Sequence, residues 1–253
     1  MDDVVAPAPP TARVVRRDAP ARTLRVGGFV PFTTTDYPGR LAAVVFCQGC
    51  PWRCGYCHNP HLLPSGAAQP HDDWDEIVPF LARRRGLLDA VVFSGGEPTA
   101  QEGLIDAITD VRALGFDVAL HTAGVHPRRL ARALEHVAWV GLDIKAPASH
   151  YARVTGVPRA AAAAFESLER VAASGVPYEV RTTVHPDLIA LPQLEALAVE
   201  LAARGVLHWV LQPFRPIGCA SAALIASAPR GTMLDRAWIE ALRRHVPGAS
   251  VRE

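Results

Sequence analysis

Short apolar segments alternate with amphipathic segments along most of the chain. Six of them have the aliphatic and β-branched composition of buried strands: residues 41–46, 90–93, 117–120, 139–143, 178–183 and 208–212. Between them, apolar residues recur with the spacing of helices that bury one face, in residues 74–81, 104–111, 130–137, 165–171 and 194–201. Gly115, Gly175 and Gly205 follow three of these segments, where glycine commonly ends a helix. A last helix is predicted over residues 233–245.

Six strand–helix units in succession predict an α/β fold with a parallel sheet and helical crossovers. Eight such units would close a barrel, so six indicate either an open doubly wound sheet or an incomplete barrel. In both architectures, functional groups gather just beyond the carboxyl ends of the strands. The residues that follow each strand are therefore the candidates for a functional site.

Composition narrows the class of protein. The chain has 253 residues, 49% of them hydrophobic, and a formal net charge of +1, which is typical of a globular protein and argues against nucleic-acid binding through a broad basic surface. No apolar run reaches the roughly 18 residues of a membrane span, and the acidic, proline-rich start does not resemble a signal peptide. These features predict a cytoplasmic protein that contacts no membrane. Residues 1–25 lack an apolar period and are expected to form a disordered or loosely attached tail, and residues 26–253 a single domain.

Four of the five cysteines lie within eleven residues, directly after the first predicted strand. Cys50, Cys54 and Cys57 have the spacing C-x3-C-x2-C, which is short enough to wrap one face of a cuboidal iron–sulfur cluster and to leave a fourth iron without a protein ligand. Two alternatives remain open. Four cysteines, with His58 or His61 in reserve, could bind structural zinc, and Cys47 could complete a four-cysteine electron-transfer cluster. The isolated Cys219 is expected to be a small buried side chain.

Polar residues follow the other predicted strands as well. Gly95, Gly96 and Glu97 come after the second, and either form a simple turn or let a ligand approach the backbone. Asp143 and Lys145, the only lysine of the chain, lie two residues apart at the end of the fourth, so they face the same side as an ion pair or as ligand contacts. The remaining candidates, for which packing or surface roles are equally open, are His121 and Thr122 after the third strand, His185 after the fifth, and Gln212 and Arg215 after the sixth.

The cysteine spacing, followed by Gly95-Gly96-Glu97 at the next strand end, resembles the signature of the radical SAM superfamily. This resemblance implies a (β/α)6 partial TIM barrel, one [4Fe–4S] cluster on Cys50, Cys54 and Cys57, and S-adenosylmethionine (SAM) bound to the open iron, whose reductive cleavage yields a 5′-deoxyadenosyl radical. It also implies contacts to SAM from a set of residues around the barrel mouth: Tyr56 near the adenine, Gly95, Gly96 and Glu97 near the methionyl amino group, Asp143 and Lys145 near the ribose or carboxylate, and Thr122 and His185 as further cofactor-side residues.

A second set of motifs is similar to one branch of that superfamily. Residues 35–40 (TDYPGR), the run QGC-x3-C-x-YCHNP and residues 143–147 (DIKAP) resemble activating proteins of anaerobic ribonucleoside-triphosphate reductases, close to pyruvate formate-lyase activating enzymes, over about residues 27–218. The sequence departs from that pattern at His121 and Ala123, where many glycyl-radical activases have Asp and Asn, and any cation or ribose contact of those groups is therefore in doubt.

The branch implies a specific activity and specific partners. The resemblance implies that the protein abstracts a hydrogen atom from a glycine of a glycyl-radical enzyme, the anaerobic ribonucleotide reductase, with an electron donor such as flavodoxin or ferredoxin. A radical SAM enzyme that acts on a small molecule or RNA, as in the queuosine pathway, and a zinc-binding structural protein are the alternatives.

Overall fold

The computed structural model describes residues 24–65, 73–229 and 234–252. Its centre is one eight-stranded sheet in which the strands follow each other in chain order. The strands are β1 (Val26–Thr33), β2 (Ala42–Cys47), β3 (Ala90–Gly95), β4 (Asp117–Thr122), β5 (Trp139–Asp143), β6 (Tyr178–Val184), β7 (His208–Pro213) and β8 (Gly248–Val251). The β1–β2 pair is antiparallel, and every later neighbouring pair is parallel.

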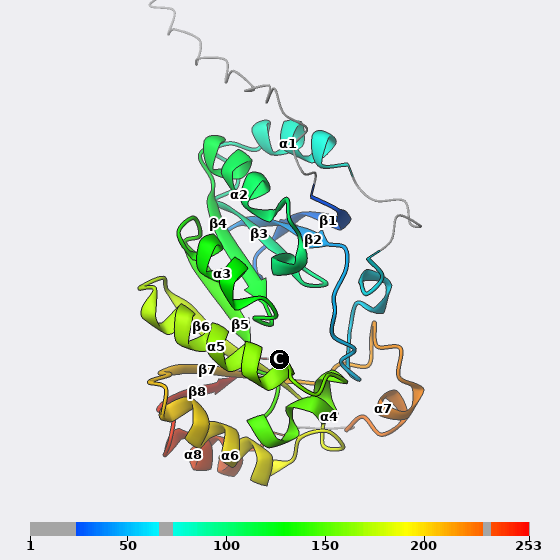
Figure 1. Cartoon of the computed structure of the whole chain (residues 1–253), viewed down its shortest axis with the longest axis vertical. Helices are drawn as coiled ribbons and strands as arrows, with labels where there is room; N and C mark the ends of the chain where they lie inside the picture. The colour runs from blue at the N-terminus through cyan, green and yellow to red at the C-terminus, as the bar shows by residue number, and fades with distance from the viewer. Residues whose placement is uncertain (1–23, 66–72, 230–233, 253) are drawn as a thin grey trace, which may run out of the picture.

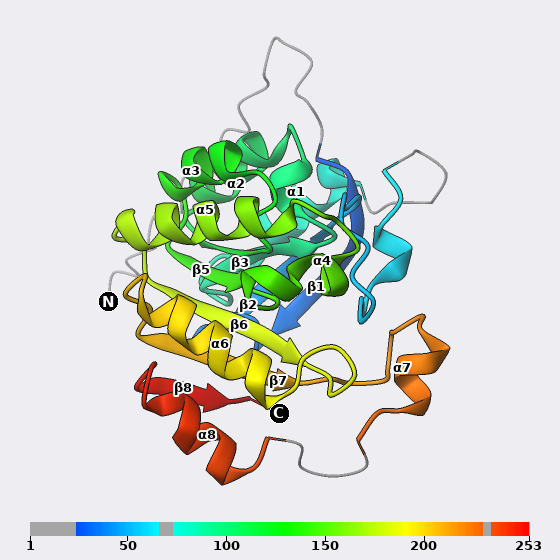
Figure 2. The same ribbon diagram turned by 60° about the horizontal axis from the view of Figure 1, so that its bottom comes forward.

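The helices form the outer layer of this sheet (Figures 1 and 2). They are α1 (Trp74–Ala82), α2 (Leu104–Ala113), α3 (Pro127–Leu134), α4 (Tyr151–Thr155), α5 (Ala160–Ala173), α6 (Leu191–Ala202), α7 (Ala222–Ala226) and α8 (Arg236–Arg243), with three short 3-10 helices, Pro60–Leu62, Pro98–Ala100 and Ala148–His150. A doubly wound sheet reverses its strand order at one point, whereas this order never reverses. The fold is therefore a partial TIM-type barrel, open between β1 and β8, and the doubly wound alternative is wrong.

All six predicted strands and five of the predicted helices occur where the hydrophobic pattern places them. The three glycines that end α2, α5 and α6 have positive φ, between 73° and 91°, as a glycine cap requires. The predicted last helix begins later than expected, at Arg236, because the side chain of Asp235 accepts a hydrogen bond from the Trp238 amide and caps it. Residue 233 lies outside the described part of the chain.

The sheet separates two apolar regions. The larger one lies between the sheet and the helices and includes Leu24, so the fold begins before residue 26; residues 1–23, most of the predicted tail, lie outside the described part. The smaller one is on the inner face of the barrel and combines alanines and valines of β2, β3 and β4 with Tyr37 and Trp139, whose rings stack at 5.4 Å.

None of the helices in the described ranges combines the length and the apolar character that a bilayer-spanning helix needs.

Candidate functional site

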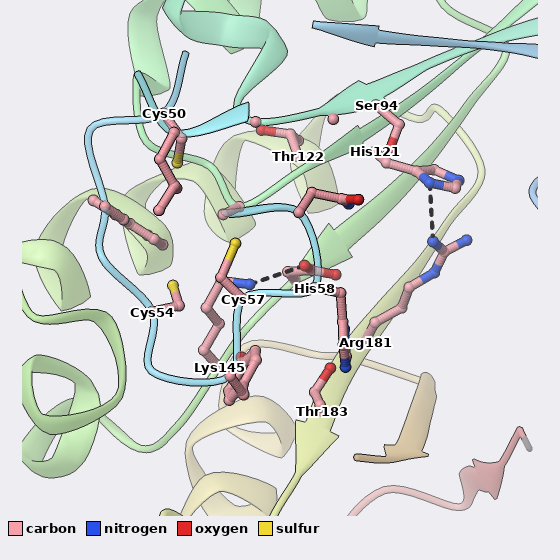
Figure 3. A pocket seen from close by; sticks show the side chains of 18 of the residues that line it. Cys50, Cys54, Cys57, His58, Ser94, His121, Thr122, Lys145, Arg181 and Thr183 are labelled. Carbon is pink, nitrogen blue, oxygen red and sulfur yellow. Dashed lines mark hydrogen bonds and ion pairs between the residues drawn. The ribbon is translucent and has the colours of Figure 1, made fainter. Parts of the chain in front are cut away.

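A pocket lies at the carboxyl ends of the strands, where the sequence predicted a site (Figure 3). The cysteine loop forms one wall and the ends of β3 to β7 form the other. The lining residues are Cys50, Trp52, Cys54, Tyr56, Cys57, His58, Asn59, Leu63, Ser94, Gly95, Gly96, His121, Thr122, Ala123, Asp143, Lys145, Arg181, Thr183 and Gln212. Residues more than 160 positions apart thus meet in one cavity.

The cysteine loop is fixed at both ends by backbone hydrogen bonds. The Gly49 amide donates to the Leu62 carbonyl at 2.7 Å, which closes the loop on itself. Farther along, the amides of Arg53 and Gly55 donate to the carbonyls of Thr155 and Val154 in α4, at 2.9 and 3.1 Å. Hydrogen bonds to the rest of the chain thus hold the loop at its base and in its middle.

Three of the five thiols face the pocket. Cys50, Cys54 and Cys57 line it and are half-buried, whereas Cys47 and Cys219 are buried and do not line it. Cys47 is the last residue of β2 and packs in the core between sheet and helices. Burial raises the pKa of the Cys50 thiol to about 12 and also raises the pKa of Cys54. Since metal ligation requires thiolates, binding of an iron–sulfur cluster would release protons from this loop.

The arrangement of the thiols fits a cluster better than a single ion. Among the described residues, no three His, Cys, Asp or Glu side chains converge closely enough to hold one metal ion. Tetrahedral zinc requires such convergence, because its sulfur ligands lie about 2.3 Å from the metal. A cuboidal cluster spreads its ligands, since each thiolate binds a different iron. The three thiols on one wall therefore suit a [4Fe–4S] cluster.

Asp143 and Lys145 form an ion pair next to the loop. Lys145 Nζ donates to Asp143 Oδ2 at 2.9 Å and lies 5.5 Å from the ring centre of Tyr56. Burial opposes the charge on Lys145, but the Asp143 carboxylate outweighs it and holds the pKa of Lys145 well above its usual value. The Tyr56 hydroxyl is buried without a hydrogen-bond partner among the described residues. A charged pair beside an unpaired hydroxyl suits a polar ligand such as SAM.

Glu97 occupies a different place from its neighbouring glycines. Gly95 and Gly96 line the pocket, whereas Glu97 is fully buried and does not line it. Its Oε1 accepts from the Thr99 amide, the Thr99 hydroxyl and the Thr122 hydroxyl at 3.0, 2.5 and 2.6 Å, and its Oε2 accepts from the Ala123 amide at 2.9 Å. The carboxylate thus ties the end of β3 to the end of β4. Contact of this side chain with SAM stays a prediction.

His185 also lies outside the pocket. Its Nε2 is 3.0 Å from the Leu224 carbonyl, its Nδ1 accepts from the Asp187 amide at 3.2 Å, and its ring packs edge-on against Phe214. Both ring nitrogens therefore have partners that hold α7 to the end of β6. Its predicted cofactor role is not visible in this arrangement and stays a prediction.

The structure adds Arg181, which was not among the sequence candidates, as the partner of the candidate His121. His121 and Arg181 meet on the pocket wall opposite the cysteines, where Arg181 Nη1 donates to His121 Nδ1 at 3.3 Å (Figure 3). The other ring nitrogen, His121 Nε2, lies 2.7 Å from the Asp36 carbonyl and donates to it. Burial and the neighbouring guanidinium lower the pKa of His121 to about 4, so its ring is neutral at pH 7. An arginine inside a predicted strand was the signal for this feature.

Comparison with known proteins places this site in a family. The sequence model of the radical SAM superfamily matches residues 44–189. The pyruvate formate-lyase-activating enzyme of Clostridium pasteurianum is 37% identical over 115 residues, which cover 44% of this chain and 48% of that protein. The PqqA peptide cyclase of Gluconobacter oxydans is 34% identical over 161 residues, 61% of this chain and 44% of that protein. The chain thus spans about half or less of the length of these curated relatives.

Solved structures show the same fold. QueE from Escherichia coli superposes with a TM-score of 0.53 at 18% identity, over 81% of this chain and 91% of that one. At this identity the likeness establishes the shared partial barrel and nothing about substrate.

Proposed function

The chain belongs to the radical SAM superfamily, and on that premise we propose that it is an activating enzyme that installs a glycyl radical on a partner, the anaerobic ribonucleotide reductase. The family uses a [4Fe–4S] cluster and SAM, and these are the cofactors of this chain. The relative named as a pyruvate formate-lyase-activating enzyme supports the general activity. The choice of reductase rests on the motifs of residues 35–40, 48–60 and 143–147, and a cytoplasmic location is part of the same proposal.

One observation carries the proposal furthest. The TDYPGR segment, which is part of the likeness to reductase activases, lies against the inner face of the barrel beside the pocket. The Asp36 carbonyl accepts from His121, a pocket residue, and Tyr37 stacks on Trp139. This motif thus contacts His121, on the pocket wall opposite the cysteines.

Residues in different parts of the pocket have different proposed roles. Cys50, Cys54 and Cys57 would hold the cluster, which when bound and reduced supplies one electron for cleavage of SAM. Lys145 and Asp143 offer a cation and an anion to a zwitterionic ligand, and Gly95 and Gly96 let it approach the backbone. The net reaction balances: SAM, one electron and a glycine C–H give methionine, 5′-deoxyadenosine and a glycyl radical.

The test is spectroscopic. Reduced, cluster-loaded protein is mixed without oxygen with SAM and the anaerobic ribonucleotide reductase of the same organism. We expect the doublet paramagnetic resonance signal of a glycyl radical and one 5′-deoxyadenosine per radical, because each cleavage delivers one hydrogen abstraction. A reductase whose target glycine is replaced by alanine is the matched control. Deoxyadenosine without a glycyl signal would reject the activase and leave the family assignment intact.

A second candidate is a radical SAM enzyme with another substrate. The alignment with the PqqA peptide cyclase covers more of this chain than the alignment with the activase, 61% against 44%. That observation favours a peptide substrate, and the small-molecule or RNA substrates suggested by the sequence belong to the same test. SAM cleavage that is stimulated by such a substrate, and not by the reductase, would favour this candidate.

A further inference from the structure

Three exposed arginines lie around the cysteine loop on the outside of the pocket. Arg53 is part of the loop, where its Nη1 donates to the carbonyls of Cys50 and Trp52 at 2.7 and 2.8 Å. Arg153 lies in α4, and Arg215 follows β7. None of the three lines the pocket, so they belong to the outer surface of the loop and not to the cavity behind it.

The segments that carry the two outer arginines pack directly on the loop. α4 meets it through the Gly55 amide, which donates to the Val154 carbonyl at 3.1 Å. On the other side, the carbonyl of Arg215 lies 2.9 Å from Nε2 of His58, the residue that follows the last cysteine of the loop. Figures 1 and 2 show the loop beside α4 and α7. The three arginines therefore stand on segments that meet around the cysteines.

These segments carry no acidic residues. The loop, α4 and the chain from β7 to α7 belong to three stretches without Asp or Glu: residues 37–71, 144–165 and 201–234. Within the described ranges, no ion pair involves any of the three guanidinium groups. One solvated arginine is ordinary, but three around one loop concentrate positive charge in a chain whose formal net charge is only +1.

The carboxylates near the loop do not cancel this charge. Asp187 is exposed beside Arg153, whose Nη2 donates to its backbone carbonyl at 2.9 Å. Asp143 lines the pocket in an ion pair with Lys145, and Glu97 is fully buried. When Asp187 is counted against the three arginines, two positive charges remain on the outer face.

The loop has an exposed position without a side chain next to one of its thiols. Cys54 lies between the exposed residues Arg53 and Gly55. Gly55 does not have a positive φ, and an added Cβ would meet the side chain of Leu224 at an ordinary 3.7 Å, so neither strain nor crowding requires glycine here. A partner can therefore approach the backbone beside Cys54 closely. Because electron transfer slows steeply with distance, such an approach suits a protein that reduces the cluster.

We propose that this outer face of the cysteine loop, with Arg53, Arg153 and Arg215 around Gly55, docks an acidic protein that donates one electron to the cluster. The donor is oxidised by one electron and the cluster is reduced by one, so no other co-reactant is needed. Complementary charge speeds the encounter of two proteins and fixes their orientation. The inference rests on the proposed function only for the need of an electron donor, which both candidate functions share.

The experiment uses a flavodoxin with an acidic surface as the probe. Its binding to cluster-loaded protein, with both proteins oxidised, is measured by calorimetric titration without oxygen at low and high salt. We expect wild-type affinity to fall as salt rises. The combined change Arg53→Gln, Arg153→Gln and Arg215→Gln should raise the dissociation constant at low salt about threefold to hundredfold, the effect of three exposed ion pairs.

The matched control removes the same charge elsewhere. Arg84→Gln, Arg85→Gln and Arg132→Gln change exposed arginines at the carboxyl ends of α1 and α3, at the end of the barrel opposite the pocket, and should leave flavodoxin binding unchanged. If the triple variant of the loop face does not retain iron, Arg153→Gln with Arg215→Gln keeps the hydrogen bonds of Arg53 within the loop. That pair should give the same effect at a smaller size.

The rate of cluster reduction is a second readout. In a stopped-flow experiment below saturation, reduced flavodoxin should reduce the cluster of the triple variant more slowly than that of the wild type. Reduced methyl viologen, a small cation that needs no docking site of opposite charge, should not be slowed. Slower reduction by both reductants would indicate an altered cluster and would contradict a role in docking.

Other outcomes would also overturn the proposal. Flavodoxin affinity that is equal in the wild type and the triple variant, or that does not change with salt, would show that these charges do not dock the donor. Loss of iron with unchanged flavodoxin binding would assign the arginines to the charge of the cluster. Unchanged flavodoxin binding with weaker binding of the ribonucleotide reductase would assign the face to that partner. None of these measurements needs a glycyl radical, so failure of the glycyl-radical assay leaves them unaffected.

Discussion

Replacement of Glu97 by glutamine tests whether this carboxylate holds the pocket together. The side chain is fully buried and accepts four hydrogen bonds from Thr99, Thr122 and Ala123. Glutamine has the same shape but only one acceptor oxygen. With that oxygen in the place of Oε1, the amide NH2 group would face the Ala123 N–H, so two donors would meet.

The magnitude follows from these contacts. The Ala123 amide would lose its acceptor, at about 1–3 kcal/mol, and the bonds to Thr99 and Thr122 would change from charge-assisted to neutral, at about 1 kcal/mol each. Lower desolvation of an amide relative to a carboxylate offsets part of this loss. A net destabilisation of about 2–3 kcal/mol remains, which lowers Tm by about 4–12 °C for a chain of this size.

The assay is thermal unfolding of the cluster-loaded protein, followed by circular dichroism without oxygen. Glu135→Gln, at an exposed position after α3, is the control and should leave Tm unchanged. A Tm for Glu97→Gln equal to that of the control would refute the reasoning. Titration of the same variant with SAM then separates the two roles: a weaker SAM affinity at unchanged Tm would mean that the carboxylate contacts the ligand directly, as the sequence predicts.

Four further predictions follow from the site. Alanine at any of the three pocket cysteines should remove about four irons on reconstitution, whereas Cys47→Ala and Cys219→Ala should retain them; loss of the cluster from Cys47→Ala would instead indicate a fully ligated electron carrier. Lys145→Ala should keep its iron and raise the SAM dissociation constant about tenfold to hundredfold, and an unchanged titration would remove this residue from the SAM site. Gly141→Ala should displace the Arg181 guanidinium and destabilise the fold by about 1–3 kcal/mol, so a wild-type Tm would contradict the close contact. The pKa of His121 in the folded protein is lowered from 6.5 to about 4, so as the pH falls the imidazole takes up a proton in the unfolded chain before it does so in the folded one. The contribution of neutral His121 to the free energy of unfolding should therefore be complete above pH 6.5 and be lost as the pH falls towards 4. A His121→Gln protein whose stability has the same pH profile would exclude this residue as the cause.

The sequence predicted the central strands and the cysteine loop because both have strong local signals. Buried parallel strands are continuous apolar runs, and a ligand loop keeps its spacing in the sequence. The sequence pattern did not predict β1 and β8, and the reasons are again local. β1 contains Gly27, Gly28 and Pro31, which weaken a strand pattern, and β8 has only four residues. Both lie at the open ends of the sheet, where less apolar character is needed.

The parts of the site that the sequence could not predict depend on contacts between distant segments. Nothing near Arg181 in the sequence shows that Arg252, from the last strand, would share Glu179 with it. Likewise, the partners of Glu97 come from its own turn and from the end of the next strand, and only the folded chain shows that four donor groups converge on this carboxylate. The type of side chain at a strand end can be predicted from sequence, whereas the hydrogen bonds that a buried polar side chain makes are a property of the assembled barrel.

His121 stands where many activases have an acid, and its hydrogen-bonding groups match those of its neighbours. A neutral histidine offers one donor and one acceptor, and here the donor meets the Asp36 carbonyl while the acceptor meets Arg181. An aspartate has acceptors only, so it could pair with Arg181 but would leave the carbonyl without a donor. It would also neutralise the guanidinium, whereas histidine leaves that charge available to the pocket. The departure at residue 121 therefore leaves this wall of the pocket one unit more positive than an aspartate would.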